Sequence, residues 1–465
     1  MKKKIAIGLA AVLAVGGSVT FFLTRDNRPV LKIANWAEYI DGGDENSELI
    51  EEFEDWYKEK TGEEIRVEYC IADDNETLYN MIKMGDYFDL ICPSEYMIMK
   101  LAAEDRLMKL PEEFFDKSNP DNYYVNNVSK YIQNTFENNS MKGKASGSSW
   151  SEYAAGYMWG TTGFVYNPEE LVNEDDVSKW SIFTNPEYAN KITAKNNVRD
   201  TYFIGLAMHY EEQLQALKTE FETGIKDQTA LTNYQSTLSL LMNDAQEETM
   251  NAVKPKLKAL ASNLYGFETD EGKNDMIGGK ISVNYQWSGD AVYIMDYAQG
   301  DDEEDPVANP VYLNYCIPDT VSNLWFDGWV LPKDCKNVTA ATMFINFLSK
   351  PENAVRNMEY IGYTSCIAGD YVFENYAKAY YEAEEDDTSA KSYDLNYYFN
   401  PSYVKGDPST ISEAYIFLSP EEQFQRQLFA QYPDEETLTR CVAMSYFDRE
   451  ENTRANLMWN DITFL

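Results

Sequence analysis

Strand and helix patterns alternate over residues 31–92, and this alternation restricts the possible folds more than any other feature of the chain. Short apolar or alternating runs predict strands, and two segments with apolar residues at helical spacing predict helices that each end at a glycine. In chain order the expected elements are a strand at 31–36, a helix at 46–60, a strand at 65–71, a helix at 76–84 and a strand at 87–92. A β-α-β-α-β order gives a parallel sheet with helices on both faces, so we expect an α/β fold.

The rest of the chain continues this alternation over a length that exceeds one folding unit. A single core rarely grows beyond roughly 250–300 residues, and the chain has 465, so we expect two lobes. Further strands are expected at 280–286 and 325–332. A long helical pattern at 238–264 contains Pro255, which lacks the backbone N–H that a helix interior uses, so we expect a break or kink there.

The first 28 residues have the pattern of an export segment. Lys2, Lys3 and Lys4 precede residues 5–23, a run of 19 residues without a charged side chain. A helix over that run would reach about 28 Å, close to the roughly 30 Å hydrocarbon core of a membrane. Small residues at 14–16 offer a cleavage site, but the apolar run continues beyond them, which favours a retained anchor over a removed signal. We expect the rest of the chain to lie outside the cytoplasmic membrane.

Charge and composition exclude several kinds of partner. The chain has 78 acidic side chains against 39 basic ones, a net charge of −39, so nucleic acid is not expected and cations are the natural partners. His209 is the only histidine, and the six cysteines show no C-x-x-C spacing, so we expect neither a metal site nor a cofactor. The pairing of the cysteines is left open by the sequence.

Four short segments place an aromatic side chain beside a carboxylate at or near the end of a predicted strand. They are Trp36 with Glu38 and Tyr39, Arg199-Asp200 near Tyr202, Trp287 with Asp290, and Trp325 with Asp327. Ligands of open α/β sheets bind beyond the carboxyl ends of the strands. A core tryptophan beside a surface acid is common by itself, but four such pairs at strand ends favour a binding site.

This combination of side chains suits a linear polyamine. Each ammonium group donates hydrogen bonds to carboxylates and is attracted to the faces of aromatic rings, while the methylene spacers lie against apolar surface. A carboxylate enclosed by protein is costly unless it is paired, so the charge of the ligand would make closure around it favourable. We therefore expect a polyamine as the ligand.

A series of longer motifs contains these residues. In chain order they are Asn35-Trp36-Ala37-Glu38-Tyr39, Asp89-Leu90 with Pro93-Ser94-Glu95-Tyr96, Trp159-Gly160, Pro186-Glu187-Tyr188 with Asn197-Val198-Arg199-Asp200, Trp287-Ser288-Gly289-Asp290, Trp325-Phe326-Asp327 and Ile361-Gly362-Tyr363. With these motifs in this order, the chain resembles the spermidine/putrescine-binding proteins of ABC importers, which have the periplasmic-binding-protein type II fold. Each motif is weak alone, but their shared order over residues 31–363 is specific.

The resemblance implies a set of ligand contacts. The aromatic residues expected to wall the ligand are Trp36, Tyr39, Tyr96, Trp287, Trp325 and Tyr363, with Ser94 also among the binding residues. The acids expected to hold its nitrogens are Glu38, Asp200, Asp290 and Asp327. Asn197 stands where spermidine-preferring members tend to have aspartate, whereas Asp290 is similar to the carboxylate of putrescine-preferring members. The choice between the two ligands therefore stays open.

The resemblance also implies lobes and partners. The N-terminal segment would cover residues 1–28, the first lobe 29–157 and 325–371, and the second lobe 158–324 and 372–465, with the ligand between the lobes. The protein would be a monomer outside the cytoplasmic membrane that closes around a polyamine by a hinge motion and passes it to the permease of an ABC importer. We assign no counterpart in the family to the acidic segment at 380–403.

Two alternatives remain open at this point. An extracellular hydrolase would use two of the acids as catalytic carboxylates and the aromatic rings to stack sugars, although four acids facing one ligand suit a polycation better. A binding protein of the same fold for another solute is the second alternative.

Overall fold

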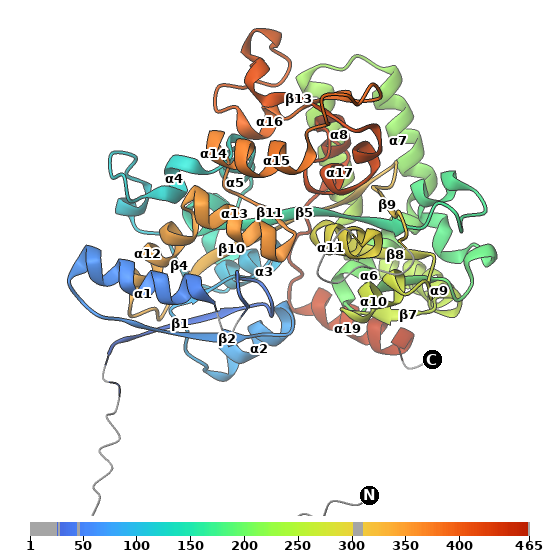
Figure 1. Cartoon of the computed structure of the whole chain (residues 1–465). Coiled ribbons are helices and arrows are strands. Elements are labelled where there is room, and N and C mark those ends of the chain that lie inside the picture. Colours follow the sequence, from blue (N-terminus) through green and yellow to red (C-terminus); the bar gives the residue numbers. More distant parts are fainter. Residues whose placement is uncertain (1–25, 27, 44–46, 301–309, 464–465) are drawn as a thin grey trace, which may run out of the picture.

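The computed structural model describes residues 26, 28–43, 47–300 and 310–463 (Figure 1). The predicted export segment at 1–28 therefore lies almost wholly outside the described residues. Within the described ranges no helix combines the length and the apolar character that crossing a membrane requires. All six cysteines lie in these ranges, and all six are free thiols.

One mixed sheet runs through the whole molecule. From edge to edge its strands are β2 (Arg66–Ile71), β1 (Val30–Asn35), β3 (Leu90–Ile91), β10 (Ser322–Pro332), β5 (Ala154–Tyr166), β8 (Val283–Trp287), β6 (Ile192–Lys195) and β7 (Gly266–Glu268). β1 is parallel to both of its neighbours and β6 is parallel to both of its own, whereas β10 and β5 form a long antiparallel pair between these two parallel regions. Shorter strands add to this sheet at β4 (Leu107–Met108), β9 (Asn314–Cys316), β11 (Thr364–Ser365) and β14 (Cys441–Val442).

The predicted β-α-β-α-β unit is confirmed, with α1 (Glu48–Thr61) and α2 (Asn75–Met84) as its helices. Both helices end at the predicted glycines, Gly62 with φ 77° and Gly85 with φ 103°. These left-handed conformations favour glycine because a side chain would clash with the backbone there. α1 packs against α12 (Val338–Leu348), where the rings of Phe53 and Phe344 meet edge to face with centroids 4.9 Å apart.

The long strands β5 and β10 join the two parallel regions, and every residue of both strands is buried. β5 pairs with β10 and β11 up to Thr161, and with β8 and β9 from Thr162 onward. Figure 1 shows β5 running from left to right across the middle of the molecule, with one group of helices below its left part and another below its right part. On one side lie α1, α2 and α3 (Glu95–Ala103), and on the other lie α6 (Val198–His209), α9 (Glu247–Asn263) and α10 (Glu271–Ile277).

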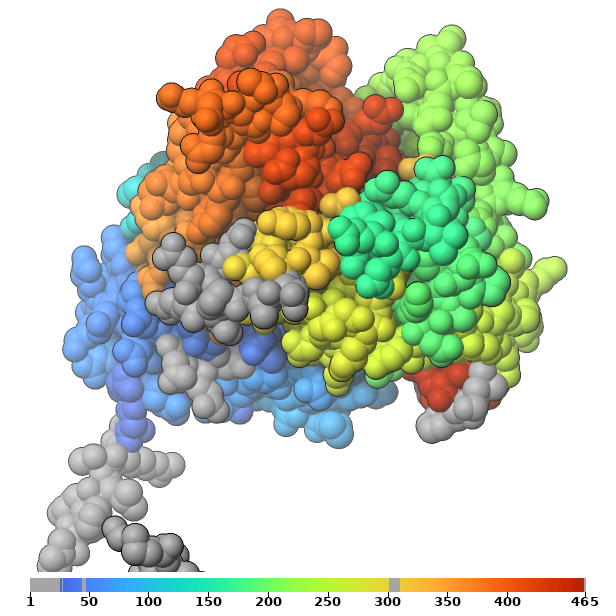
Figure 2. Space-filling model, turned by 45° about the vertical axis from the view of Figure 1, so that its right-hand side comes forward, coloured from blue at the N-terminus to red at the C-terminus, as the bar shows by residue number. Residues whose placement is uncertain are grey.

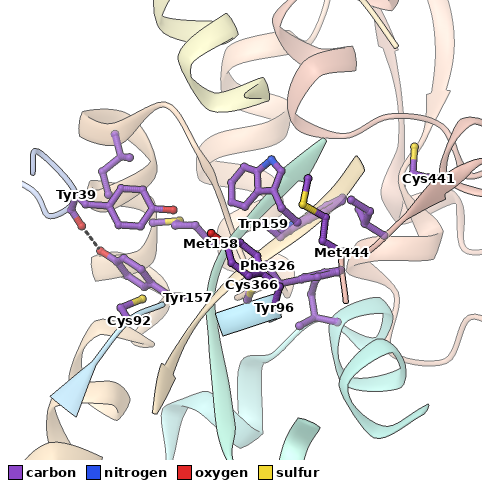
Figure 3. Close-up of a cluster of buried hydrophobic side chains, with 14 of the residues drawn as sticks. Tyr39, Cys92, Tyr96, Tyr157, Met158, Trp159, Phe326, Cys366, Cys441 and Met444 are labelled. Atoms are coloured by element: carbon purple, nitrogen blue, oxygen red, sulfur yellow. Dashed lines mark hydrogen bonds between the residues drawn. The ribbon is translucent and has the colours of Figure 1, made fainter. Parts of the chain in front are cut away.

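The crossing strands share a dense aromatic core (Figure 3). Trp159 of β5 and Phe326 of β10 lie nearly parallel, with ring centroids 6.5 Å apart. The Tyr157 hydroxyl donates a hydrogen bond of 2.8 Å to the backbone carbonyl of Tyr39, which follows β1. This contact fixes the segment after β1 against the crossing strands, and that segment contains three of the predicted site residues.

The chain after residue 371 contacts helices on both sides of β5. α16 (Asn396–Phe399) lies against α5 (Lys130–Asn138), α17 (Gln427–Gln431) against α11 (Ser288–Gln299), and α19 (Arg449–Thr463) against α9. The Trp159 indole also donates to the Tyr398 hydroxyl at 2.9 Å. In the space-filling view much of this segment forms the top of the molecule, in orange and red (Figure 2). Its assignment to the second lobe remains a prediction, as do the other lobe boundaries.

The remaining regular elements complete the outer layers. They are α4 (Tyr123–Asn127), α7 (Glu211–Thr223), α8 (Gln228–Met242), α13 (Pro351–Ile361), α14 (Asp370–Val372), α15 (Lys378–Tyr381), α18 (Glu435–Leu438) and a hairpin of β12 (Lys391–Asp394) with β13 (Ile416–Ser419).

Of the break or kink predicted at Pro255, the break is wrong. α9 continues through Pro255, and the helical pattern is interrupted earlier, between Met242 and Glu247. In that gap the Asp244 carboxylate accepts a hydrogen bond from the backbone of Gln246 at 2.9 Å and turns the chain. α9 packs against both α6 and α19, and this packing offsets the single backbone hydrogen bond that a proline removes.

Candidate ligand-binding site

Asp327 lies at an irregularity in β10. The pairing of β10 with β5 shifts register between Asp327 and Gly328, and Asp327 forms an isolated bridge with Ser94 at the start of α3. The backbone N–H of Gly328 donates to the Pro93 carbonyl at 3.1 Å. A bulge bends a strand and changes the direction of its side chains. The irregularity therefore brings the Asp327 carboxylate to the end of β3, where the sequence predicts binding residues.

The Asp327 carboxylate is held by three neutral donors. The Ser94 hydroxyl donates to Oδ1 at 2.7 Å, while the Trp36 indole and the Tyr39 hydroxyl donate to Oδ2 at 3.1 and 3.0 Å. Asp327 is only 6% exposed, and no lysine, arginine or histidine nitrogen among the described residues lies within 4.0 Å of it. Burial raises its pKa to about 6, even though the three donors stabilise the ionised form.

Tyr363 joins this carboxylate to a second one. Its ring meets the rings of Tyr39 and Trp325 edge to face, with centroids 5.5 and 5.3 Å apart. Burial and the nearby Asp290 carboxylate raise the pKa of Tyr363, so the hydroxyl keeps its proton. Gly289 makes the approach possible, since a Cβ there would lie 2.0 Å from the Tyr363 ring.

Three parallel strands end together on the other side of Tyr363. β6 ends at Lys195, β7 at Glu268 and β8 at Trp287, and Lys195 and Glu268 are partners in the strand register. The helices that follow β6 and β8 carry Asp200 and Asp290 in their first turns. The amino end of a helix favours a negative charge. This edge therefore gathers three carboxylates around one lysine and one indole.

Lys195 is the centre of that group. Its side chain is 1% exposed, and its ammonium lies 3.1 Å from a Glu268 carboxylate oxygen and 4.0 Å from one of Asp290. The same nitrogen donates to the Thr269 carbonyl at 2.9 Å. It also lies 4.1 Å from the centroid of the Trp287 indole, a cation–π distance. Every contact expected of a bound ammonium is thus made by the protein itself.

A second lysine, Lys273 of α10, also lies near Asp290. Its ammonium is close to Oδ1, whereas that of Lys195 is close to Oδ2. The Lys273 ammonium lies 3.5 Å from Asp290 and 3.2 Å from Asp270. Burial alone would lower the pKa of Lys273, but Asp290, Asp270 and Glu38 raise it above its usual value. Glu38 is exposed in the turn after β1, where its backbone has φ 53°. The negative charge of Glu38 therefore stabilises the charged form of Lys273 in α10.

Asp200 is buried beside the same group. Burial raises its pKa to about 6, against the opposing effects of Lys195 and Arg199. Asn197 caps the amino end of α6, because its side-chain oxygen accepts from the backbone of Arg199 at 2.7 Å and of Asp200 at 3.3 Å. Asn197 thus orients the helix that carries Asp200.

Tyr96 is covered by an arginine of the chain. The Arg199 guanidinium carbon lies 4.5 Å from the centroid of the Tyr96 ring and 3.8 Å from that of Phe447. The Tyr96 hydroxyl donates to the Glu76 carboxylate at 3.3 Å. One face of this predicted wall residue is therefore occupied by Arg199.

The predicted site residues form two groups joined through Tyr363. Around Asp327 the structure gathers Trp36, Tyr39, Ser94, Trp325 and Tyr363. Around Lys195 it gathers Asp200, Trp287 and Asp290. Glu38 lies near Lys273, and Tyr96 lies under Arg199. Contact of each of these residues with a ligand remains a prediction.

Sequence reasoning missed Lys195, Lys273 and Glu268. Lys195 and Glu268 end strands β6 and β7, just as Trp287 ends β8. Ligands of open α/β sheets bind beyond the carboxyl ends of the strands. A search of strand ends for lysines and for single acids, as well as for aromatic–acid pairs, would have found both residues. Lys273 lies inside a helix, and its sequence neighbours carry no comparable signal.

The comparisons with known proteins agree with this architecture. The model of the bacterial extracellular solute-binding protein family matches residues 48–371. The spermidine/putrescine-binding periplasmic protein of Salmonella typhimurium is 24% identical over 356 residues, which cover 76% of this chain and 81% of that protein. The putrescine-binding periplasmic protein of Pseudomonas aeruginosa is 28% identical and covers 73% of this chain and 79% of its own length.

A solved structure has the same fold over almost the whole chain. A Listeria monocytogenes protein assigned to spermidine/putrescine ABC transport superimposes with a TM-score of 0.61 at 25% identity, covering 93% of this chain and 98% of its own. This superposition extends beyond residue 371, where the family model ends. The expected periplasmic-binding-protein type II fold is thereby confirmed.

Proposed function

Because the chain belongs to the family of bacterial extracellular solute-binding proteins, we propose that it is the polyamine-binding component of an ABC importer. The relatives named for spermidine and putrescine binding support this proposal, since each is matched over most of its length. The observation that carries it is the Asp327 carboxylate, which is buried among aromatic side chains with neutral donors and no cation within 4.0 Å in the described residues.

A ligand ammonium group would supply the charge that Asp327 lacks. An ionised carboxylate taken out of water costs several kcal/mol unless a cation compensates it. The rings of Trp36, Tyr39 and Tyr363 would attract the same cation and cover the methylene chain beside it. A net charge of −39 over the chain would also raise the local concentration of a polycation.

The site would work by closure of two lobes around the ligand. Tyr363 and Tyr96 come from the predicted first lobe; Tyr363 lies against Gly289, and Tyr96 packs against Arg199, both of the predicted second lobe. β5 and β10 form the connection about which the lobes would turn. The closed protein would then be recognised by the permease, outside the cytoplasmic membrane, as a monomer held near the membrane by its N-terminal segment.

Calorimetric titration of the purified protein with putrescine, cadaverine, spermidine and spermine tests the ligand. We expect saturable binding of at least one of the four, and no heat of binding with any of them would refute the function. We assign the site no catalytic role. Release of product from glycans by the same preparation would instead support a carboxylate-dependent hydrolase.

Small-angle scattering with and without the bound polyamine tests the closure. We expect the radius of gyration to be smaller with the ligand, because hinge motion brings the lobes together. An identical scattering curve in both states would contradict hinge closure and leave the binding function standing.

A further inference from the structure

The ammonium of Lys195 lies among groups that the sequence analysis assigned to the ligand. It has a carboxylate at 3.1 Å, a second carboxylate at 4.0 Å, a carbonyl at 2.9 Å and the face of Trp287 at 4.1 Å. Trp287 and Asp290 are both predicted ligand contacts. We infer that Lys195 takes the place of one ligand ammonium group, so that the site selects a diamine over a triamine.

The inference rests on the proposed polyamine function and narrows its ligand class. Lys195 is the last residue of β6, and its side chain is 1% exposed. Its ammonium therefore supplies positive charge at this end of the site without a ligand. A ligand nitrogen that approached Glu268 or the covered face of Trp287 would have to displace this ammonium. Displacement would leave a buried lysine without its partners, which is strongly unfavourable.

The carboxylates of the Lys195 group already have cationic partners within the chain. Three carboxylates, Asp200, Glu268 and Asp290, face Lys195 and Lys273, and Arg199 also acts on Asp200. A third ammonium group would therefore meet carboxylates that already have a lysine or arginine of the chain as a partner. Asp327 offers the opposite situation, because no cation of the described residues lies within 4.0 Å of it. A ligand with two ammonium groups should thus bind more tightly than one with three.

The test compares putrescine with spermidine by calorimetry on the wild-type protein and on Lys195→Met. We expect the wild type to bind putrescine more tightly. In Lys195→Met the ratio of the two dissociation constants should shift toward spermidine by about tenfold or more, because a third ammonium can then reach Glu268, Asp290 and Trp287. Lys195→Arg is the matched control, since it keeps the charge, and it should keep the wild-type ratio.

The outcomes separate this inference from the proposed function. A wild type that binds neither amine refutes the function itself. A wild type that prefers spermidine, or an unchanged ratio in Lys195→Met, overturns the role of Lys195 and leaves polyamine binding intact.

A measurement on the unaltered protein applies even if Lys195→Met does not fold. Reductive methylation followed by mass spectrometry reports which lysines are accessible. Lys195 should stay unmodified both without ligand and with saturating putrescine, because its ammonium remains on Trp287. Modification of Lys195 that appears only when the amine is added would show displacement and overturn the inference.

Discussion

The Asp327 end and the Lys195 end of the site use the same kinds of side chain to opposite effect. At both ends a buried carboxylate lies beside a tryptophan. Around Asp327 the partners are a hydroxyl, an indole and a phenol, all neutral. Around Asp290 the partners include two lysines, with nitrogens 3.5 and 4.0 Å from its oxygens. One end therefore requires a cation from outside, and the other contains its own.

This difference shows that an aromatic residue beside an acid does not by itself mark a place for a ligand charge. A buried carboxylate is costly at either end, but neighbouring elements of the chain can supply the compensation. Removal of a carboxylate at the Lys195 end should therefore act mainly on folding, and removal of one at the Asp327 end mainly on binding. The predictions below test that separation, from the largest expected effect to the smallest.

Glu268→Gln should lower the free energy of unfolding of the ligand-free protein by about 3–5 kcal/mol. The change removes the carboxylate closest to the buried Lys195 ammonium, 3.1 Å away. Denaturant unfolding measures it. Glu222→Gln is a control, because its pair with Lys218 is partly exposed at 3.7 Å and should contribute roughly 0–1 kcal/mol. If the two variants lose the same stability, Glu268 is not needed to compensate Lys195.

Asp327→Asn should weaken binding of the preferred polyamine by about 2–5 kcal/mol, since it leaves a ligand ammonium unpaired in an enclosed site. The ligand-free protein should be as stable as the wild type or more so, because a buried carboxylate without a cation is removed. Calorimetry and a thermal melt give the two values. An affinity loss below roughly tenfold, about 1.4 kcal/mol, would remove Asp327 from the site.

Polyamine affinity should fall by about tenfold for each pH unit below 6 for each carboxyl group that binds the ligand in its ionised form. Burial raises the pKa of Asp327 from 3.8 to about 6, so this carboxyl group gains a proton in that range. Titrations at several pH values measure the fall, and an affinity that does not change between about pH 7 and 5 would contradict the role of Asp327.

The raised pKa of Asp327 has the opposite effect on the stability of the ligand-free protein, which should fall as the pH rises. A folded-state pKa above the ordinary value means that the folded protein holds its proton more tightly than the unfolded chain. The contribution of Asp327 to stability is therefore present below about pH 4 and is lost as the pH rises through about 6. In Asp327→Asn this part of the pH dependence should disappear.

Tyr39→Phe should weaken binding by about 0.5–1.5 kcal/mol, the range for one hydrogen bond. The phenol donates to Asp327 at 3.0 Å and stabilises its ionised form, so its loss should also move the midpoint of the pH dependence upward. Tyr79→Phe is the control, because the Tyr79 hydroxyl donates to the exposed Glu104 carboxylate. A midpoint that stays in place in Tyr39→Phe would show that the phenol does not tune Asp327.

The fold could be predicted largely from local patterns. The first strands and helices follow from apolar spacing, and Gly62 and Gly85 mark the helix ends because only their left-handed conformations close the last turn. The break near Pro255 could not be placed, since the packing of α9 against two other helices outweighs the loss of one hydrogen bond. Local propensity is a weak guide wherever tertiary packing decides.

The site could be predicted only in part. Trp36 and Ser94 are near strand ends as expected, but Asp327 is in the middle of β10, and the register shift there brings its side chain into contact with theirs. Lys195 and Glu268 become neighbours because β6 and β7 are parallel and in register, a pairing between segments more than seventy residues apart. Sequence spacing cannot show that pairing, and so it cannot show which acids are already neutralised.

A crystal structure of the protein with putrescine tests the central claim most directly. We predict one ligand nitrogen at about 3 Å from the Asp327 carboxylate, with the Lys195 ammonium still against Trp287 and Glu268. A ligand nitrogen seated between Glu268 and Trp287 with Lys195 displaced, or a ligand that makes no contact with Asp327, would contradict the account.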